Sequence, residues 1–522
     1  MGDFFPEKKG RLVDSYARVS IYEGFPFFYY EVSGHAFSAE EAAVYDALVS
    51  IISGRMGFDE AQGSKGKSLP KAFVEGFREK ILKPITYGQA LEFILPSEDY
   101  SAISSSFLAL VSEHLHFVKN PALLAELVFG DSIGYGKISA LMLDENLEEI
   151  MVNGYERDIF IYHRKYGHCK TNLRFLSRKD LDSLVQKIAR TVGKKLDADS
   201  PLLDARLPDG NRANATYTFV TPFGPSLTIR KFTGVPLSIV DLISNNTLSS
   251  EVAAFLWVMV EGLGVEPMNI IVTGGSSSGK TTTLNALASF IRFPERIVSI
   301  EDTLELQLRG RENWVQMEAR PRIGVQEGVY MDDLLRNAMR MRPDRLIVGE
   351  VRGSEAQVMF VAMDTGHKGC LGTLHGNSAK EMLLRLKSEP MSVPEPLLSL
   401  LNLVVVQSRL RINGKGIVRR VISVTEVSSM ESRPLLSNAY EWNGKEDALS
   451  RTSVPIALLD LLSQKTLRTK KEIEQEIGVR RRVLEWMLRN GLTAQPEVEL
   501  LIQQYYYNPD EILAKVLSDT TS

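Results

Sequence analysis

The sequence contains only two cysteines, Cys169 and Cys370, in 522 residues. Two thiols cannot build a four-cysteine zinc site or a disulfide framework, so a reducing compartment such as the cytoplasm fits best. No stretch approaches the ~20 consecutive apolar residues that a membrane-spanning helix needs, and the first residues lack the apolar core of a signal peptide. We therefore expect a cytoplasmic protein, which a membrane partner could still hold at the membrane surface.

The chain also has little excess of charge of either sign. Its net charge is −4, which gives no argument for a polyanionic partner. A chain of 522 residues is too long for a single hydrophobic core. We expect four domains: a mixed domain of helices and strands over 1–130, an α+β domain over 131–240, an α/β domain over 241–430 and a small helical domain over 431–522.

Residues 269–281 are the most informative stretch of the sequence. They form an apolar segment followed by a glycine-rich loop that ends in Lys-Thr and opens a helix. The spacing from Gly274 to Gly279, Lys280 and Thr281 is G-x-x-x-x-G-K-T, the P-loop pattern. The backbone N–H groups of such a loop and the positive end of the following helix hold a phosphate chain. The competing interpretation is a plain glycine-serine turn between a strand and a helix.

The P-loop interpretation assigns a role to each side chain of the loop. Lys280 reaches the β- and γ-phosphates of ATP, and the Thr281 hydroxyl is a ligand of Mg²⁺. ATP and Mg²⁺ are therefore the predicted ligands. The predicted nucleotide-binding residues are Gly274, Gly275, Ser276, Ser277, Ser278, Gly279, Lys280, Thr281 and Thr282.

Apolar strands recur around the P-loop and alternate with helical segments. Almost continuously apolar strands are typical of a parallel sheet that helices cover on both faces. The pattern predicts an α/β fold for this part of the chain. The expected strands cover residues 269–273, 296–300, 345–349, 369–374 and 403–406.

Carboxylates follow two of these strands. Glu301, Asp302 and Glu305 come at the end of one strand, and Glu350 at the end of another, with Arg352 two residues later. On open α/β sheets, ligands bind at the carboxyl ends of the strands, where carboxylates can position a water or hold Mg²⁺. A single carboxylate after a strand is equally well a helix cap or a solvated loop residue, but two such clusters in one P-loop domain favour catalysis.

Two histidines, His367 and His375, flank a third strand. A metal site would need a third ligand, and the sequence offers none nearby. A core or capping role is one interpretation of these histidines. The other is that His375 senses phosphate by donating a hydrogen bond toward the γ-phosphate of ATP.

The order of these motifs resembles the type II/type IV secretion ATPase superfamily. Along this chain the motifs are, in order, the P-loop, an Asp box at Ile300–Glu305, a strand ending in Gly-Glu-Val-Arg-Gly, and a His box from Thr365 to His375. Segments 204–212 and 228–232 also resemble the N-terminal domain of these enzymes. The opening segment and the tail (480–486 and 504–510) look most like the archaeal branch, which drives archaella, type IV pili and related filaments. The resemblance implies a RecA-like P-loop domain with a parallel-sheet core, preceded by an α+β domain and followed by a small helical domain.

The resemblance also implies catalytic roles. Glu305 would polarise the attacking water, and Glu350 would order Mg²⁺ through a water molecule. Arginines of the N-terminal domain would reach the nucleotide at a domain or subunit boundary; Arg206, Arg212 and Arg230 lie in the matching segments, and the sequence does not rank them. The alternative is that these arginines only pair with nearby carboxylates. Unlike many bacterial relatives, this chain lacks the cysteines of a zinc module.

In family terms the chain resembles a homo-hexameric ATPase, peripherally associated with the cytoplasmic membrane. It would push on a polytopic membrane platform protein and act indirectly on pilin-like subunits, powering assembly of a pilus-like or archaellum filament or protein secretion. Hydrolysis would change the angle of a cleft that holds ATP between the N-terminal and P-loop domains.

Two other classes of function compete with this prediction. The first is a RecA-like motor that translocates nucleic acid, for which Lys470, Lys471 and Arg480–Arg482 would form part of a helix-turn-helix. Glutamates interleave with these basic residues, which favours a solvated helix face and no specific nucleic acid. The second is an assembly scaffold that binds nucleotide without hydrolysing it, which the presence of Glu305 and Glu350 disfavours.

Overall fold

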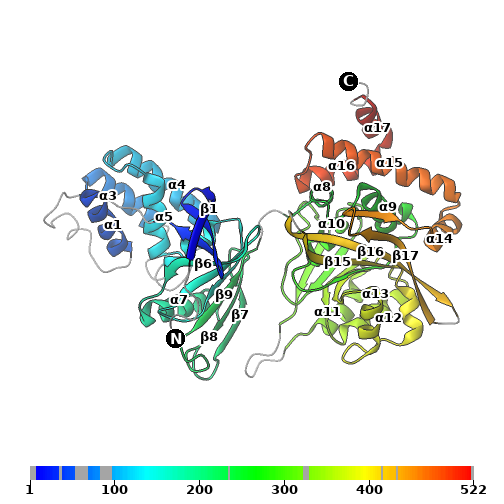
Figure 1. The fold of residues 1–522 in the computed structure, drawn as a ribbon, viewed down its shortest axis with the longest axis horizontal. Helices are drawn as coiled ribbons and strands as arrows, with labels where there is room; N and C mark the ends of the chain where they lie inside the picture. Colours follow the sequence, from blue (N-terminus) through cyan, green and yellow to red (C-terminus); the bar gives the residue numbers. More distant parts are fainter. Residues whose placement is uncertain are drawn as a thin grey trace. The chain divides into compact units, whose positions relative to one another are not determined.

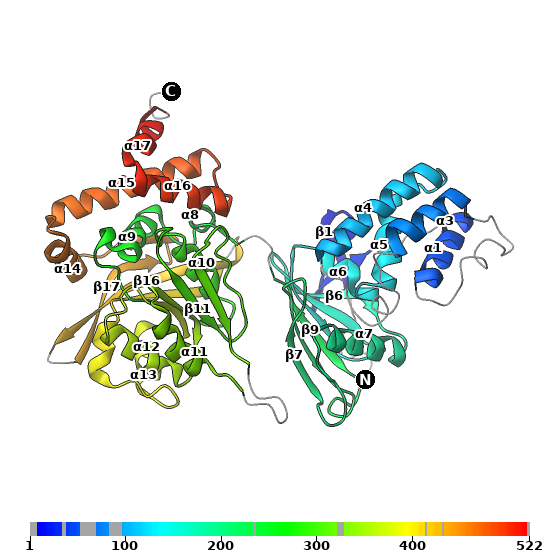
Figure 2. The same ribbon diagram turned by 180° about the vertical axis from the view of Figure 1, so that it is seen from behind.

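The computed structural model describes residues 8–33, 38–52, 69–82, 97–232, 236–320, 328–412, 415–430 and 433–518. The chain divides into two compact units, Met1–Gly234 and Val235–Ser522, and each contains a nine-stranded sheet. Figures 1 and 2 show the elements of each unit from two sides.

One continuous sheet runs through the first unit, in the order β1-β2-β3-β6-β5-β4-β9-β8-β7. The parallel pairing of β3 with β6 joins the three N-terminal strands to the rest. The domain boundary that we predicted at residue 130 therefore falls inside one compact unit. The strands are β1 (Lys8–Tyr16), β2 (Val19–Phe25), β3 (Phe28–Val32), β4 (Leu147–Val152), β5 (Asp158–His163), β6 (Gly167–Arg174), β7 (Leu202–Arg206), β8 (Arg212–Thr216) and β9 (Ser226–Arg230).

Helices α1, α3, α4 and α5 build a core of their own, centred on buried phenylalanines such as Phe73 and Phe107. A capping box precedes α1, because Ser38 and Glu41 exchange side-chain and backbone hydrogen bonds. A separate amphipathic helix, α7, packs its apolar side on the sheet. The helical elements are α1 (Ala39–Ile52), α3 (Lys71–Phe77), η1 (Arg78–Leu82), α4 (Ser97–His114), α5 (Pro121–Ser132), η2 (Gly136–Ile138), α6 (Ser139–Leu143) and α7 (Arg178–Thr191).

The sheet of the second unit has the order β12-β11-β13-β14-β10-β15-β16-β17-β18. Its strands from β12 to β15 in this order are parallel, so their carboxyl ends lie at one edge. The five predicted strands are confirmed, with boundaries that differ by a few residues. The strands are β10 (Ile270–Gly274), β11 (Ile297–Glu301), β12 (Trp314–Glu318), β13 (Arg345–Val351), β14 (Leu371–His375), β15 (Leu403–Ile412), β16 (Gly416–Met430), β17 (Arg433–Asn443) and β18 (Ala448–Arg451).

Helices cover both faces of this sheet, as the apolar strands predicted. Ile270 and Val272 of β10 pack into one core with α8, α9 and α10, whereas Ile271 points to the opposite core with α11, α12 and α13. Figure 1 shows the two helix layers on either side of the sheet. The elements are α8 (Ile239–Ser244), α9 (Ser250–Glu261), η3 (Gly262–Gly264), α10 (Lys280–Ala288), α11 (Met331–Ala338), η4 (Met339–Met341), α12 (Glu355–Asp364), α13 (Ala379–Lys387) and η5 (Glu395–Leu400).

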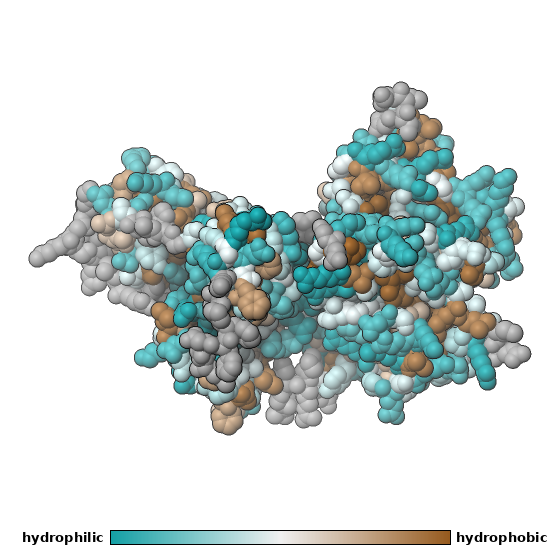
Figure 3. All heavy atoms as spheres, in the orientation of Figure 1, coloured by the Kyte–Doolittle hydropathy of each residue, from teal (hydrophilic) through white to brown (hydrophobic). Residues whose placement is uncertain are grey.

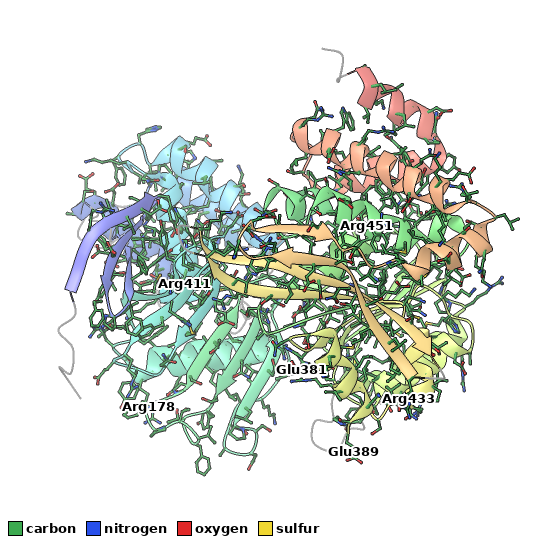
Figure 4. The ribbon with its side chains drawn as sticks, turned by 45° about the vertical axis from the view of Figure 1, so that its right-hand side comes forward. Arg178, Glu381, Glu389, Arg411, Arg433 and Arg451 are labelled. Carbon is green, nitrogen blue, oxygen red and sulfur yellow. The ribbon has the colours of Figure 1, made fainter. Side chains whose placement is uncertain are left out.

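The prediction that 431–522 is helical is wrong for its first part, because β17 and β18 extend the sheet there. Strand β18 pairs with Tyr440–Asn443 of β17. The part of β17 that contains Pro434 therefore has no described strand on the side away from β16. Figure 4 shows Arg411 and Arg433 at opposite ends of the β15–β17 ribbon. The remaining helices are α14 (Ala457–Thr466), α15 (Lys470–Arg489), α16 (Gln495–Tyr507) and α17 (Pro509–Ser518).

The basic cluster of the tail does not form a helix-turn-helix, because Lys470 to Arg489 is one continuous helix. Thr469 and Glu472 form a capping box at its N-terminus. The prediction of a solvated face is wrong for Arg480, which is 3% exposed and pairs with Glu261. The basic residues of this helix therefore serve in part to attach it to α9.

Within the described ranges, no helix is long and apolar enough to cross a membrane. Hydrophilic and hydrophobic residues are interspersed on the visible face of the second unit (Figure 3).

Candidate active site

The loop between β10 and α10 has the backbone geometry of a phosphate-binding loop. Ser277 and Gly279 both have a positive φ, of 57° and 95°, which turns the loop tightly into the first turn of α10. The ammonium of Lys280 donates hydrogen bonds to the carbonyls of Gly274 and Gly275, at 3.2 and 3.1 Å. Because Lys280 is only 8% exposed, its charge is held inside the loop.

The residues of the loop fit a bound phosphate chain. A Cβ added to Gly274 would come within 2.1 Å of the Gln407 carbonyl and 2.6 Å of Ser278 Oγ, so a side chain at 274 would collapse the loop. The buried Ser278 hydroxyl has no hydrogen-bond partner among the described residues. A buried polar group of this kind fits a ligand that completes its hydrogen bonding. Thr281 and Thr282 are half-buried in the first turn of α10.

Glu350 and His375 lie next to each other at the same edge of the sheet. His375 is the last residue of β14 and pairs in register with Gly274 at the start of the loop. Its Nε2 lies 2.8 Å from Glu350 Oε1, although Oε1 accepts no hydrogen bond from the described residues in this geometry. Arg352 Nη2 donates to the other oxygen of Glu350 at 2.5 Å. The structure thus brings two of the predicted catalytic side chains together.

The positive charge of Lys280 acts on His375. Burial lowers the pKa of the His375 ring below its ordinary value of 6.5, and the charge of Lys280 lowers it further, whereas Glu350 opposes the shift. His375 is therefore neutral at pH 7, with one ring nitrogen able to donate a hydrogen bond.

This arrangement predicts opposite shifts of the His375 pKa in two variants. In Lys280→Met the pKa should rise, because a cation that disfavours the protonated ring is lost; in Glu350→Gln it should fall, because an anion that favours the protonated ring is lost. An NMR titration of the His375 ring would measure both shifts. The electrostatic link would be disproved if the two variants shifted the pKa in the same direction.

Glu301 shapes the segment that carries Glu305. Glu301 is 2% exposed, and its Oε2 accepts hydrogen bonds from the backbone N–H groups of Glu305 and Leu306 at 2.7 and 2.9 Å. A Cβ at Gly349 would come within 2.7 Å of Glu301 Cγ, so Gly349 of β13 leaves the space that Glu301 fills. The Asp box therefore contains a buried carboxylate that folds the loop and a second, half-buried one, Glu305.

Two residues at this edge were missed in the sequence. The buried Gln407 of β15 accepts a hydrogen bond from the Thr283 hydroxyl of α10 at 2.7 Å. Arg419 of β16 donates from Nε to the Ser277 carbonyl at 3.1 Å. Both side chains come from strands more than a hundred positions after the loop. The sequence marks only Gln407, as the first polar residue after the apolar segment 403–406.

Replacing Arg419 by alanine should weaken ATP binding. The loss of one hydrogen bond to the loop should raise the KM for ATP by about fivefold, with a smaller change in kcat. Steady-state phosphate release over a range of ATP concentrations measures this effect. Arg411→Ala is the control, because Arg411 lies on the neighbouring strand and is exposed. Equal KM values for both variants would contradict a contribution of Arg419 to the loop.

The three predicted arginines form one row across the first unit. Arg206 of β7 pairs in register with Arg212 of β8, which pairs with Arg230 of β9, so the three side chains share the face opposite the core. Arg212 makes a bidentate ion pair with Asp204, at 2.9 and 2.6 Å. Among the described residues, Arg206 and Arg230 pair with no carboxylate, and the Arg206 guanidinium lies over the Phe232 ring.

The other candidate ligands form no metal site. The part of the chain that the structure describes contains no group of three or more histidine, cysteine or acidic residues that could hold a metal ion. His367 lies at the end of α12, and its backbone N–H donates to the Ala362 carbonyl at 3.0 Å. This supports the capping interpretation for His367.

A buried strand that enters a glycine-rich loop, with a lysine inside it and polar side chains at neighbouring strand ends, defines a P-loop nucleotide-binding protein. Residues 133–452 match the family described as Type II/IV secretion system protein. The chain belongs to this family, and it is therefore an ATPase of the type II/IV secretion class.

Individual relatives share most of the chain. An uncharacterized protein of Methanocaldococcus jannaschii, MJ0781, is 30% identical over 73% of this chain and 76% of its own length. The conjugal transfer protein TrbB of Rhizobium radiobacter is 28% identical over 59% of this chain and 92% of its own length. Among solved structures, the pilus retraction motor PilT with bound ADP is 19% identical over 64% of this chain and 90% of that chain, with a TM-score of 0.41.

Proposed function

We propose that this chain is a ring motor, a homo-hexamer, that hydrolyses ATP to power assembly of a type IV pilus-like or archaellum filament, or protein secretion, through a polytopic membrane platform protein. It would act in the cytoplasm at the membrane surface and reach pilin-like subunits only indirectly. The observation that carries the proposal is the meeting of Lys280, Glu350 and His375 at the edge of the sheet, beside a loop built for phosphates. The secretion family over residues 133–452 supports the coupling to transport.

Each residue of the site has a separate role in ATP hydrolysis. The backbone of residues 274–282 holds the β- and γ-phosphates, and Lys280 neutralises their charge. Glu305 accepts a proton from the attacking water. Neutral His375 donates a hydrogen bond to the γ-phosphate and thereby distinguishes ATP from ADP.

Thr281 and Glu350, the latter through a water molecule, would hold Mg²⁺, which supplies positive charge to the phosphates. Because Glu350 already contacts Arg352 and His375, its carboxylate is oriented before any ligand binds.

We further propose that one arginine of the row across β7, β8 and β9 contacts the γ-phosphate of ATP. Arg206 and Arg230 are better suited than Arg212, which Asp204 already engages. Loss of this contact after cleavage would release the N-terminal domain and convert hydrolysis into movement.

Arg206→Ala or Arg230→Ala should lower kcat by about ten- to hundredfold through the loss of a charge-assisted hydrogen bond. Arg212→Ala should have a smaller effect, because its guanidinium is committed to Asp204. Phosphate release at saturating ATP measures the three variants. If Arg212→Ala were the most impaired, the ranking would be wrong, and if none were impaired, none of these arginines would contact the γ-phosphate.

The motor function is tested by ATPase activity with and without phospholipid or the reconstituted membrane platform protein. We expect stimulation by the membrane partner and a hexamer in light scattering with ATP present. Stimulation by DNA instead would favour the nucleic-acid motor. The burial of Arg480 weighs against that alternative, because the arginine is not available to a phosphate backbone.

A further inference from the structure

The end of the P-loop helix is held by side chains from the C-terminal helices. Beyond α10, the carbonyls of Ser289, Phe290 and Ile291 need hydrogen-bond donors from elsewhere in the fold. Gln503 of α16 donates from Nε2 to the carbonyls of Ser289 and Ile291, at 3.1 and 2.8 Å. The Tyr506 hydroxyl, also on α16, donates to the Phe290 carbonyl at 2.7 Å.

Arg311 adds a buried charge to the same place. Its Nη2 donates to the Ser289 and Ile291 carbonyls at 3.2 and 2.5 Å, and its Nε donates to Glu499 of α16 at 2.7 Å. Both side chains of this ion pair are only 2% exposed. A cation is favourable at a helix C-terminus, where the carbonyl dipoles point outward. We call Arg311, Glu499, Gln503 and Tyr506 the α10 clasp.

The α10 clasp also reaches the catalytic segment. Arg311 is the last residue of the stretch that begins at Glu301 and contains Glu305. Within this stretch the backbone N–H of Gln307 donates to Asn285 Oδ1 of α10 at 2.8 Å. The stretch from Glu301 to Arg311 is thus held at three points. The Glu301 carboxylate holds its start, Asn285 of α10 holds Gln307 in its middle, and Glu499 of α16 holds Arg311 at its end. In Figures 1 and 2, α16 lies beyond the end of α10 in both views.

We propose that Arg311 and Gln503 are positioning residues, through which α16 sets the position of Glu305 relative to the nucleotide on α10. The P-loop and Glu305 lie on different elements, and the clasp joins the far ends of both to one helix. A shift of α16 moves α10 and the Glu305 segment together, whereas loss of the clasp lets them move independently. The proposal rests on the role proposed for Glu305 in hydrolysis.

The test compares kcat, the KM for ATP and thermal stability of the full chain. Arg311→Lys keeps the charge but not the fork, and Gln503→Glu keeps the shape but loses the donors. Both should lower kcat by about tenfold or more, because small misplacements of a catalytic group are costly, with little change in KM. Glu499→Gln removes the anion that pairs with the buried Arg311 and should lower kcat in the same direction.

A matched control separates positioning from loss of stability. Arg420 is also a buried arginine, 4% exposed, that forks onto Asp447 at 2.7 and 2.9 Å, on β16 and away from the end of α10. Arg420→Lys should reduce thermal stability to a similar degree but leave kcat near that of the wild type. Tyr506→Phe, which removes a single hydroxyl, replaces Arg311→Lys if that variant does not fold.

The outcomes distinguish a failure of the clasp proposal from a failure of the role proposed for Glu305. The clasp would be purely structural if Gln503→Glu and Arg311→Lys lost stability but kept the wild-type kcat. The same conclusion would follow if Arg420→Lys lost as much activity as these two variants. If Glu305→Gln hydrolysed ATP as fast as the wild type, the assigned role of Glu305 would fail first. A lower kcat in the clasp variants, unchanged in Arg420→Lys, would support the proposal.

Discussion

Glu305→Gln is expected to lower kcat for ATP hydrolysis by about 10³-fold, while ATP still binds. Glutamine keeps the size of the side chain but cannot accept a proton from water, and general bases contribute about 10²- to 10⁴-fold to such reactions. The backbone of Glu305 is fixed by the buried Glu301, so the substitution should not disturb the loop. Phosphate release measures kcat, and a fluorescent ATP analogue measures binding.

The control is Glu312→Gln, an exposed carboxylate in the segment that follows. It should hydrolyse ATP like the wild type. If the wild type and Glu305→Gln were equally slow, the chain would be a nucleotide-dependent scaffold and the motor proposal would fail. If only Glu350→Gln were slow, Glu350 would be the base.

Lys280→Ala should abolish both tight nucleotide binding and hydrolysis, with kcat/KM reduced by about 10³-fold. The ammonium of Lys280 is the only charge that the described loop residues 274–282 contribute, and its removal also leaves the carbonyls of Gly274 and Gly275 without their donor. Isothermal titration with ATP measures the binding, and phosphate release measures the activity.

Lys387→Ala is the control for this variant, because Lys387 pairs with Glu395 at the surface of the same unit. Its affinity and activity should match those of the wild type. Unchanged ATP affinity in Lys280→Ala would mean that the loop at residues 274–282 does not bind the phosphates.

The sequence predicted the parallel sheet and the P-loop well, because both depend on local patterns. The apolar strand 269–273 and the spacing from Gly274 to Thr281 are complete within a few residues. The meeting of Glu350 and His375 also followed from sequence, since carboxyl ends of parallel strands share one edge.

The parts that the sequence did not reveal depend on contacts between distant residues. Gln407 reaches the P-loop because β15 lies beside β10, and Arg419 reaches it because β16 pairs with β15. Strand β17 was missed because Pro434 and scattered polar residues argue against a strand, and a free strand edge tolerates them. Arg480 looks like a surface charge in sequence, but Glu261 and Trp257 form a buried site for it.

The pairing of β3 with β6 affects how the first unit folds as the chain is synthesised. Strands β1 to β3 can form a meander early, but the partner that joins them to the main sheet comes only after the α1–α5 helices. Until β6 leaves the ribosome, β3 presents an unpaired edge, which is open to pairing with other chains. Helices α1, α3, α4 and α5 have a core of their own, so their early folding would shorten the effective loop between the two strands and limit that exposure.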